Sequence, residues 1–209
     1  MIKYFDIFAG IGGFRSGLEK AGGFQCVGYC EIDKYAKKAY ETLYDTENEV
    51  YYDDARKIDP NELPDLDLIC GGFPCQSFSI AGKRKGFSDT RGTLFFEIAR
   101  IAAVKKPKYL LLENVPRLLS HDQGRTFAAI LGALDELGYD VAWQVLNSAD
   151  FGVPQSRKRV YIIGFHREKC SGKVLSFTDA NPKTLVKRIS GREGNRVYSA
   201  DGLSITLTS

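Results

Sequence analysis

The sequence lacks the features that would place it in a membrane or mark it for export. No apolar run approaches the roughly 18 residues that a membrane-spanning helix requires, and hydrophobic residues make up 44% of the 209. The N-terminal residues open directly on a strand-like run, so we expect no signal peptide. Internal repeats and low-complexity segments are also missing. The length and composition are those of a soluble protein with one sizeable domain and part of a second.

The sequence also lacks the spacing of a metal site. Its five cysteines form an odd set, and Cys26 and Cys30 lie four residues apart in a predicted strand with no second pair to match. The two histidines, His121 and His166, are interpreted as surface or packing residues. We therefore expect no bound metal, and reduced cysteines in an intracellular protein.

Charge is unevenly distributed along the chain. Residues 1–150 hold 18 Lys and Arg against 22 Asp and Glu, whereas residues 151–209 hold 11 against 4, within a formal net charge of +3. A basic C-terminal portion favours a polyanionic partner. A solvated, loosely ordered tail would have the same composition, so charge alone leaves both interpretations open.

Apolar runs alternate with amphipathic stretches through most of the chain. Strands are predicted over residues 2–8, 25–31, 66–70, 109–113, 141–146 and 159–165, and helices over 13–21, 34–44, 93–104 and 125–137. Trp143 is expected in the core. Strands separated by helices predict an α/β fold with a doubly wound, mostly parallel sheet. Ligands of such sheets bind beyond the carboxyl ends of the strands.

The first predicted strand runs into the glycine-rich stretch FAGIGGF, residues 8–14. Gly10 and Gly12 permit a tight turn and close approach of a ligand, but Arg15 occupies the place of the third glycine of the dinucleotide fingerprint. Glu31 ends the next strand, where a carboxylate can bind ribose hydroxyls, and Asp54 could accept from an adenine amino group. Two carboxylates without a P-loop lysine indicate a nucleoside ligand that has no polyphosphate, and S-adenosylmethionine fits this description. The alternative is a glycine turn with acidic residues on the surface and no ligand.

Residues 71–76, GGFPCQ, follow a predicted strand and place Cys75 at the mouth of a loop. Pro74 fixes its own φ and stiffens the segment that presents the thiol. This position suits a nucleophile, although a buried structural cysteine would fit the same motif taken alone. The long loop over residues 71–92 carries Lys83 and Arg91 and has no apolar period, as functional loops often do.

Six motifs in one order resemble those of the DNA (cytosine-5)-methyltransferases, especially the small bacterial modification enzymes. They are FAGIGGF (8–14), EID (31–33), DAR (54–56), GFPCQSFS (72–79) with GF (86–87) and DTRG (89–92), ENV (113–115) and QSRKR (155–159). The family more often has Asp-Ile in the third motif. The resemblance covers residues 4–165 and implies the S-adenosylmethionine-dependent methyltransferase fold.

The resemblance also implies a covalent mechanism. The thiolate of Cys75 would add to carbon 6 of cytosine, which makes carbon 5 nucleophilic towards the sulfonium methyl group. Glu113 would hold N3 and the exocyclic amine of the base, and Arg159 would contact O2. Arg157 would support the same side of the base as Arg159. Nearby positive charge would favour the thiolate. Because a stacked base is out of reach, the target must flip out of duplex DNA.

The remaining site residues are implied by the same resemblance. The cofactor, S-adenosylmethionine, would contact Phe8, Gly10, Gly12, Glu31, Ile32, Asp54 and Ala55. The DNA would contact Phe73, Pro74, Gln76, Ser79, Lys83, Arg91, Asn114, Gln155 and Arg196. The expected partner is duplex DNA, with no membrane and no metal, in the bacterial cytoplasm near the nucleoid.

The match departs from the family after residue 166. Residues 191–198 and 202–208 resemble part of a target-recognition region, but they follow the catalytic motifs at a shorter spacing than usual. The last two motifs of the family have no counterpart. We therefore predict a catalytic domain over 1–166 and a partial recognition region over 167–209. A truncated chain, a chain completed by a second polypeptide, or one lacking segments would each give this pattern. A tRNA methyltransferase with the same motifs and a non-catalytic binding remnant are the competing functions.

Overall fold

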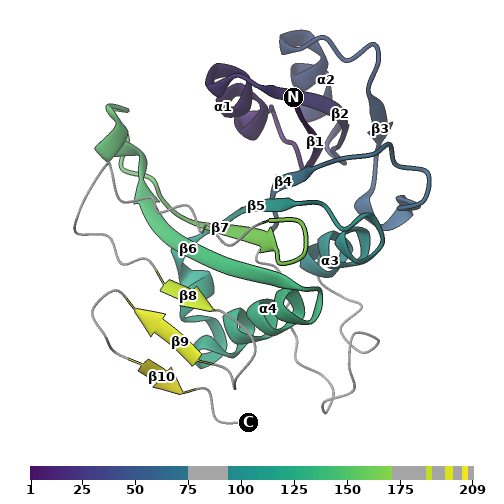
Figure 1. Ribbon diagram of the computed structural model, residues 1–209. Helices are drawn as coiled ribbons and strands as arrows, with labels where there is room; N and C mark the ends of the chain where they lie inside the picture. Colours follow the sequence, from purple (N-terminus) through teal and green to yellow (C-terminus); the bar gives the residue numbers. More distant parts are fainter. Residues whose placement is uncertain (75–93, 171–186, 190–195, 200–203, 207–209) are drawn as a thin grey trace. The chain divides into compact units, whose positions relative to one another are not determined.

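The computed structural model describes residues 1–74, 94–170, 187–189, 196–199 and 204–206, the last three ranges by their backbone only (Figure 1). The chain forms two compact units, Met1–Leu112 and Glu113–Ser209. The division falls within strand β5 (Tyr109–Asn114). This division reflects packing and leaves the predicted functional boundary at residue 166 a prediction.

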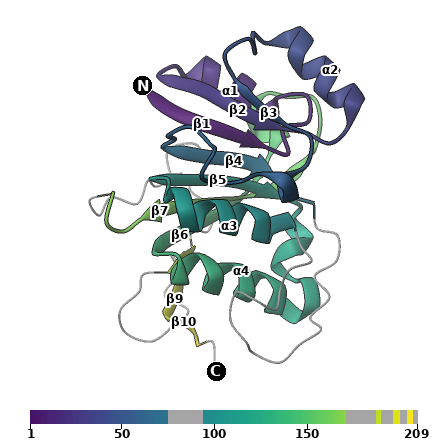
Figure 2. The ribbon, with the colours of Figure 1, turned by 90° about the vertical axis from the view of Figure 1, so that its right-hand side faces the viewer.

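The first unit contains a parallel sheet. Its strands are β1 (Ile2–Ile7), β2 (Phe24–Cys30), β3 (Val50–Tyr52), β4 (Leu68–Gly72) and most of β5. β1 pairs in parallel with both β2 and β4, and β2 pairs in parallel with β3. Figure 2 shows these strands side by side in the order β5-β4-β1-β2-β3. The sequence prediction of a parallel α/β arrangement is confirmed in this unit.

The order of the strands makes the sheet doubly wound. The chain passes outward from β1 to β2 and β3 through helices α1 (Gly13–Ala21) and α2 (Lys34–Leu43), then returns to β4 on the other side of β1 and continues through α3 (Leu94–Lys105). Right-handed crossovers place helices of the two directions on opposite faces of a sheet. The direction reverses between β1 and β4, and ligands of such sheets bind at the carboxyl ends of strands at this reversal.

Local signals explain where α1 and α2 begin. Gly12 precedes α1 in the left-handed conformation, with φ 89°. Asp33 caps α2, because its carboxylate accepts from the amides of Tyr35 and Ala36 at 2.8 and 2.9 Å, as N-cap side chains do. The predicted helix over 13–21 is confirmed at both ends, and the one over 34–44 ends a single residue earlier.

Strand β4 differs from its prediction, which ended at residue 70. The strand continues through Gly71 and Gly72, which the prediction assigned to the following loop. The reason is a close approach of two backbones: a Cβ at position 71 would lie 2.0 Å from the carbonyl oxygen of Ile7. Gly71 therefore permits the contact between β4 and β1 instead of ending the strand.

The second unit is antiparallel. β6 (Tyr139–Asn147) pairs with β7 (Lys158–His166) along its whole length. The short strands β8 (Lys187–Ile189), β9 (Arg196–Ser199) and β10 (Ser204–Thr206) follow, each antiparallel to its neighbour. Helix α4 (Arg125–Glu136) packs on β6, where Trp143 lies against Phe127 at a ring-centroid distance of 5.1 Å. Both predicted strands and the core position of Trp143 are confirmed.

Strands β8 to β10 were not predicted, because apolar periodicity fades after residue 166. They are three or four residues long, too short to show an alternating pattern, and they form by pairing on β6 or on each other. In the described parts of the chain, no helix is both long and apolar enough to cross a membrane. The same parts contain no cluster of side chains suited to a metal ion.

Candidate functional site

The turn after β1 contains three residues in the left-handed backbone conformation. Phe8, Gly10 and Gly12 have φ of 59°, 57° and 89°. The Ala9 amide donates to the Cys30 carbonyl at 3.0 Å, and the Gly12 amide to the Ala9 carbonyl at 2.9 Å. A Cβ at Gly10 would meet nothing within 4 Å, whereas one at Gly12 would lie 2.3 Å from the ring of Tyr44. Gly10 thus leaves open space beside the turn, and Gly12 permits close packing.

Glu31 was expected to end the second strand and lies one residue after it, because β2 ends at Cys30. Its carboxylate is hydrogen-bonded to this turn. One carboxylate oxygen accepts from the Gly10 amide at 2.7 Å and the other from the Asp33 amide at 2.8 Å. A carboxylate offers about four acceptor positions, so two remain for other donors. A pair of ribose hydroxyls needs two such acceptors. The arrangement fits a nucleoside whose sugar lies beside Gly10.

The third predicted cofactor residue has a different environment. Asp54 caps the short helix η1 (Ala55–Lys57) by accepting from the Arg56 amide at 3.0 Å. Its carboxylate also pairs with the Arg56 guanidinium at 2.6 Å, and this hydrogen bond lowers the pKa of Asp54. Ala55 is buried, while Ile32, after Glu31, is 70% exposed. An adenine amino group would share Asp54 with Arg56, and Ile32 offers an apolar surface to a base.

In the second unit, the structure brings together two residues predicted to hold the cytosine. Nε of Arg159, on β7, lies 2.6 Å from Oε1 of Glu113, on β5. The side chains are 20% and 21% exposed, so water reaches both without fully solvating them. Arg159 also donates to the Lys158 carbonyl at 2.7 Å. Burial, and then the charge of Glu113, raises the pKa of nearby Tyr161, which stays neutral beside the pair.

The neighbouring motif residues have structural contacts of their own. Arg157 is exposed and lies before β7; its amide donates to Ser148 Oγ at 3.2 Å. Gln155 is exposed. Asn114 is buried, and its Oδ1 accepts from the Val115 amide at 2.8 Å. Because β7 begins at Lys158, Arg157 lies before the strand and Arg159 lies within it.

Several predicted residues lie outside the described part of the chain. These are Cys75, Gln76, Ser79, Lys83 and Arg91. Arg196 lies on β9, which is described by its backbone only. Before this gap, Phe73 is buried against Phe95, with ring centroids 5.5 Å apart, and Pro74 is exposed. The ring of Phe73 thus anchors the chain two residues before Cys75.

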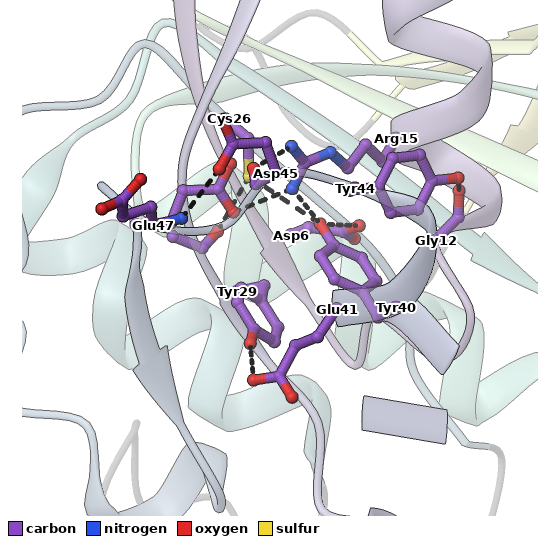
Figure 3. Close-up of polar contacts among 12 residues, drawn as sticks. Asp6, Gly12, Arg15, Cys26, Tyr29, Tyr40, Glu41, Tyr44, Asp45 and Glu47 are labelled. Carbon is purple, nitrogen blue, oxygen red and sulfur yellow. Dashed lines mark hydrogen bonds and ion pairs between the residues drawn. The ribbon is translucent and has the colours of Figure 1, made fainter. Parts of the chain in front are cut away.

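The sequence did not predict a buried polar cluster behind the glycine turn (Figure 3). The Arg15 guanidinium, on α1, donates to Glu19 and Glu49 at 2.8 Å each, and to the Asp45 carbonyl at 2.8 Å. Tyr40 donates to Asp6 at 3.3 Å. Asp6 is wholly buried, and burial raises its pKa to about 8.

One signal in the sequence could have revealed the cluster. Arg15 stands three residues before Leu18, and both lie on the buried face of α1. An arginine on a buried helix face requires acceptors, so it predicts acidic partners in the elements packed on that face. Position alone does not say which acids these are.

Comparison with known proteins gives one consistent family. The family model described as C-5 cytosine-specific DNA methylase matches residues 2–202. Type II methyltransferase M.NgoBI of Neisseria gonorrhoeae is 54% identical over 167 residues, which cover 79% of this chain and 51% of that protein. Type II methyltransferase M.HhaI of Haemophilus parahaemolyticus is 38% identical over 245 residues, covering 99% of this chain and 74% of that protein.

The chain spans about half the length of most of these curated relatives. The alignment with M.HhaI is 245 residues long against 209 in this chain, so that relative carries residues with no counterpart here. Among solved structures, S. pombe Dnmt2 methyltransferase has a TM-score of 0.65 at 23% identity, covering 83% of this chain and 53% of that one. This likeness shows that the fold is the methyltransferase fold predicted from the sequence.

Proposed function

Because the chain belongs to the C-5 cytosine-specific DNA methylase family, we propose that the protein methylates carbon 5 of a cytosine in duplex DNA. The methyl donor is S-adenosylmethionine, and the target lies within a specific sequence. The observation that carries the proposal is the ion pair between Glu113 and Arg159, 2.6 Å apart. In this reaction, the pair holds the base while Cys75 attacks it.

The pair matches one edge of cytosine. That edge presents O2 as an acceptor and the N4 amine as a donor, with N3 between them. A guanidinium beside a carboxylate presents the complementary order, a donor and an acceptor. Arg159 donates to O2, and Glu113 accepts from N4 and from N3 when N3 carries a proton. Protonation of N3 draws electrons from carbon 6 and promotes addition of the thiolate. Arg157 supports this side of the base.

The residues at the carboxyl ends of β1 and β2 fit S-adenosylmethionine. Glu31 accepts from the ribose hydroxyls, and the open side of Gly10 admits the nucleoside. Ile32 and Ala55 contact the adenine, and Asp54 accepts from its amine; Phe8 and Gly12 complete the turn. When bound, this molecule supplies an electrophilic methyl group on a positively charged sulfur.

Cys75 performs the covalent step. Its thiolate forms a bond to carbon 6, and the electron pair of the 5,6 double bond becomes available at carbon 5. Carbon 5 would take the methyl group as the bond from that methyl to the sulfonium sulfur breaks and leaves a neutral thioether, and it would then lose its proton to solvent. The same electron pair re-forms the double bond, the carbon–sulfur bond breaks, and the thiolate is regenerated. Each bond made to the enzyme is broken again, so Cys75 is a nucleophilic catalyst.

DNA is favoured over RNA as substrate because the relatives near 50% identity are named type II methyltransferases. This assignment includes a catalytic domain over 1–166 and a recognition region over 167–209. Phe73, Pro74, Gln76, Ser79, Lys83, Arg91, Asn114, Gln155 and Arg196 are assigned to the DNA side. Action beside a restriction enzyme in the bacterial cytoplasm, and completion by further residues of the same or a second polypeptide, belong to the same proposal.

A mechanism-based trap tests this function. In duplex DNA carrying 5-fluorocytosine, fluorine replaces the proton that carbon 5 must lose, so the elimination that breaks the carbon–sulfur bond is blocked. The protein should therefore form a complex that survives denaturation and maps to Cys75. The Cys75→Ser variant should form none and should transfer no methyl group. A tRNA carrying the same base is the competing substrate. An adduct at Cys26, Cys30, Cys70 or Cys170, or preferential trapping by tRNA, would contradict the proposal.

A further inference from the structure

Tyr44, the residue directly after α2, connects that helix to the glycine turn. Its hydroxyl donates to the Gly12 carbonyl oxygen at 2.9 Å (Figure 3). The same carbonyl accepts from the Ser16 amide at 2.9 Å, the first hydrogen bond of α1. One carbonyl with two lone pairs thus joins the turn, the start of α1 and the end of α2.

The ring of Tyr44 is itself held in place. The guanidinium carbon of Arg15 lies 4.5 Å from the ring centroid, a cation–π distance. The same guanidinium donates to the carbonyl of Asp45, the next residue, at 2.8 Å. The Arg15 side chain is only 6% exposed, and Glu49 balances its charge. Arg15 therefore fixes both the ring and the adjoining backbone.

The same turn carries the predicted cofactor contact. The Gly10 amide donates to Glu31 at 2.7 Å, so the position of that amide determines where the carboxylate points. Glycine turns have many accessible backbone conformations, and a turn containing both Gly10 and Gly12 needs external restraint. Tyr44 supplies one through its bond to the Gly12 carbonyl.

We propose that Tyr44 is a positioning residue for S-adenosylmethionine. Its hydroxyl holds the Gly12 carbonyl, which fixes the turn and thereby the Gly10 amide that orients Glu31. Arg15 contributes indirectly, because it holds the ring of Tyr44. The inference rests on the proposed cofactor, and it assigns to Tyr44 and Arg15 a role in cofactor affinity that the motif residues alone do not explain.

The test is cofactor binding by the full 209-residue chain, measured by titration calorimetry with S-adenosylmethionine and S-adenosylhomocysteine. Tyr44→Phe removes one hydroxyl and keeps the ring against Arg15, and the Gly12 carbonyl retains its bond from Ser16. We expect the Kd to rise about 2- to 10-fold, the effect of one ordinary hydrogen bond. Arg15→Lys, which keeps the charge and loses the fork geometry, should raise the Kd at least as much.

The matched control is Tyr29→Phe. Tyr29 donates its hydroxyl to Glu41, on α2, at 2.7 Å, so the same chemical change removes a hydroxyl bond that is not made to the turn. The ring remains and keeps its packing with Tyr40 and Ala9. This variant should bind like the wild type. The melting temperature of each unliganded variant is measured in parallel, because a merely structural role would lower it without changing the Kd of the folded protein.

Three outcomes would overturn the inference, and they are distinguishable. An unchanged Kd in Tyr44→Phe, whatever its melting temperature, shows that the hydroxyl does not position the cofactor. Equal weakening in Tyr29→Phe shows general loosening of the unit. Absence of binding by the wild type, both alone and with the rest of the relatives' length supplied, removes the proposed cofactor itself, which separates failure of the proposed function from failure of the positioning role.

Discussion

Glu31 and Glu113 are carboxylates at strand ends with different partners, and their removal should have different consequences. Glu113→Gln should lower turnover by about 10²–10⁴-fold, as for other positioned acid–base groups, because a neutral amide supports the protonated base poorly. Its affinity for S-adenosylmethionine should be unchanged. Steady-state kinetics and calorimetry on one preparation, in which a further polypeptide supplies the rest of the relatives' length, measure both quantities.

Glu31→Ala should have the opposite effect. It removes the acceptor of the Gly10 and Asp33 amides together with the expected ribose contact. Hydrogen bonds to charged groups contribute about 1.5–3 kcal/mol, so cofactor affinity should fall roughly 10- to 100-fold. If instead Glu113→Gln loses cofactor binding and Glu31→Ala retains it, the two assignments are reversed.

Asp6 predicts an unusual dependence of stability on pH. Burial raises its pKa to about 8 in the folded chain, from 3.8 for the free side chain. Between about pH 4 and pH 8, the folded state therefore keeps a proton that the unfolded state has already released. Stability from this group is fully present below pH 4 and is lost as pH rises towards 8.

The variant Asp6→Asn mimics the protonated carboxyl and should flatten that dependence. Urea unfolding of the wild type and of Asp6→Asn between about pH 5 and pH 8 gives the two slopes, which should differ by at most about 1.4 kcal/mol per pH unit. Asp65→Asn is the control, because the Asp65 side chain is fully exposed. Parallel slopes in the wild type and Asp6→Asn would show that Asp6 ionises normally.

Among individual residues, the sequence predicted those that belong to motifs. It missed those whose contacts depend on how the elements pack. Glu31 was predicted from its place at a strand end, and Glu113 and Arg159 were predicted from the family resemblance. The structure shows the contact of Glu31 with Gly10 and the ion pair between Glu113 and Arg159. Arg15 was noted only because it occupies the place of the third glycine of the dinucleotide fingerprint. Its bonds join α1 to residues 30 and 34 positions later, and such partners depend on how the elements pack.

Among the elements, the contact between β4 and β1 makes a clear prediction. In Gly71→Ala, the new methyl group would meet the Ile7 carbonyl at 2.0 Å, and backbone cannot move aside without shifting the strand. We expect a loss of about 1–3 kcal/mol or more, as for other overpacked positions. Chemical denaturation measures the change.

Gly17→Ala provides the comparison. Gly17 is exposed within α1, and a Cβ there meets nothing within 4 Å. Alanine should therefore stabilise the chain by about 0.5–1 kcal/mol, because glycine is unfavourable in a helix interior. A Gly71→Ala variant as stable as the wild type would mean that β4 and β1 are further apart than described.

Element positions were largely predictable because helices and buried strands differ in apolar period. The observed boundaries of the predicted elements lie within two residues of the prediction. The largest differences have physical causes. Gly71 and Gly72 were assigned to the loop, but the close approach of Gly71 to β1 continues the strand. The antiparallel pairing of β6 with β7 was not stated in advance, because periodicity shows that a strand exists and not the direction of its partner.

For the whole molecule, the uneven distribution of charge predicts the strength and salt dependence of DNA binding. Residues 151–209 carry 11 Lys and Arg against 4 Asp and Glu, and phosphate contacts make affinity fall steeply with salt. Because the chain spans about half the length of most relatives, we expect weak binding without sequence preference and little methyl transfer by these 209 residues alone.

Fluorescence anisotropy with two unrelated duplexes at low and moderate salt tests this expectation. Adding a polypeptide that supplies the rest of the relatives' length, fused or in trans, should restore both specificity and transfer. Tight, sequence-selective binding and normal turnover by the 209-residue chain would show that the additional residues are dispensable.

The central place of β1 in its sheet has a consequence for the order of events during synthesis. Asp6 and Cys70 pair across β1 and β4 and are 64 residues apart in the chain. At roughly 5–20 residues per second, the ribosome takes several seconds to make the second partner after the first. During that interval, β1 and β2 can pair, but one edge of β1 stays open with its apolar side chains uncovered. The nascent protein is therefore most exposed to misassociation before β4 emerges, and slowing translation ahead of residue 68 should lengthen that interval.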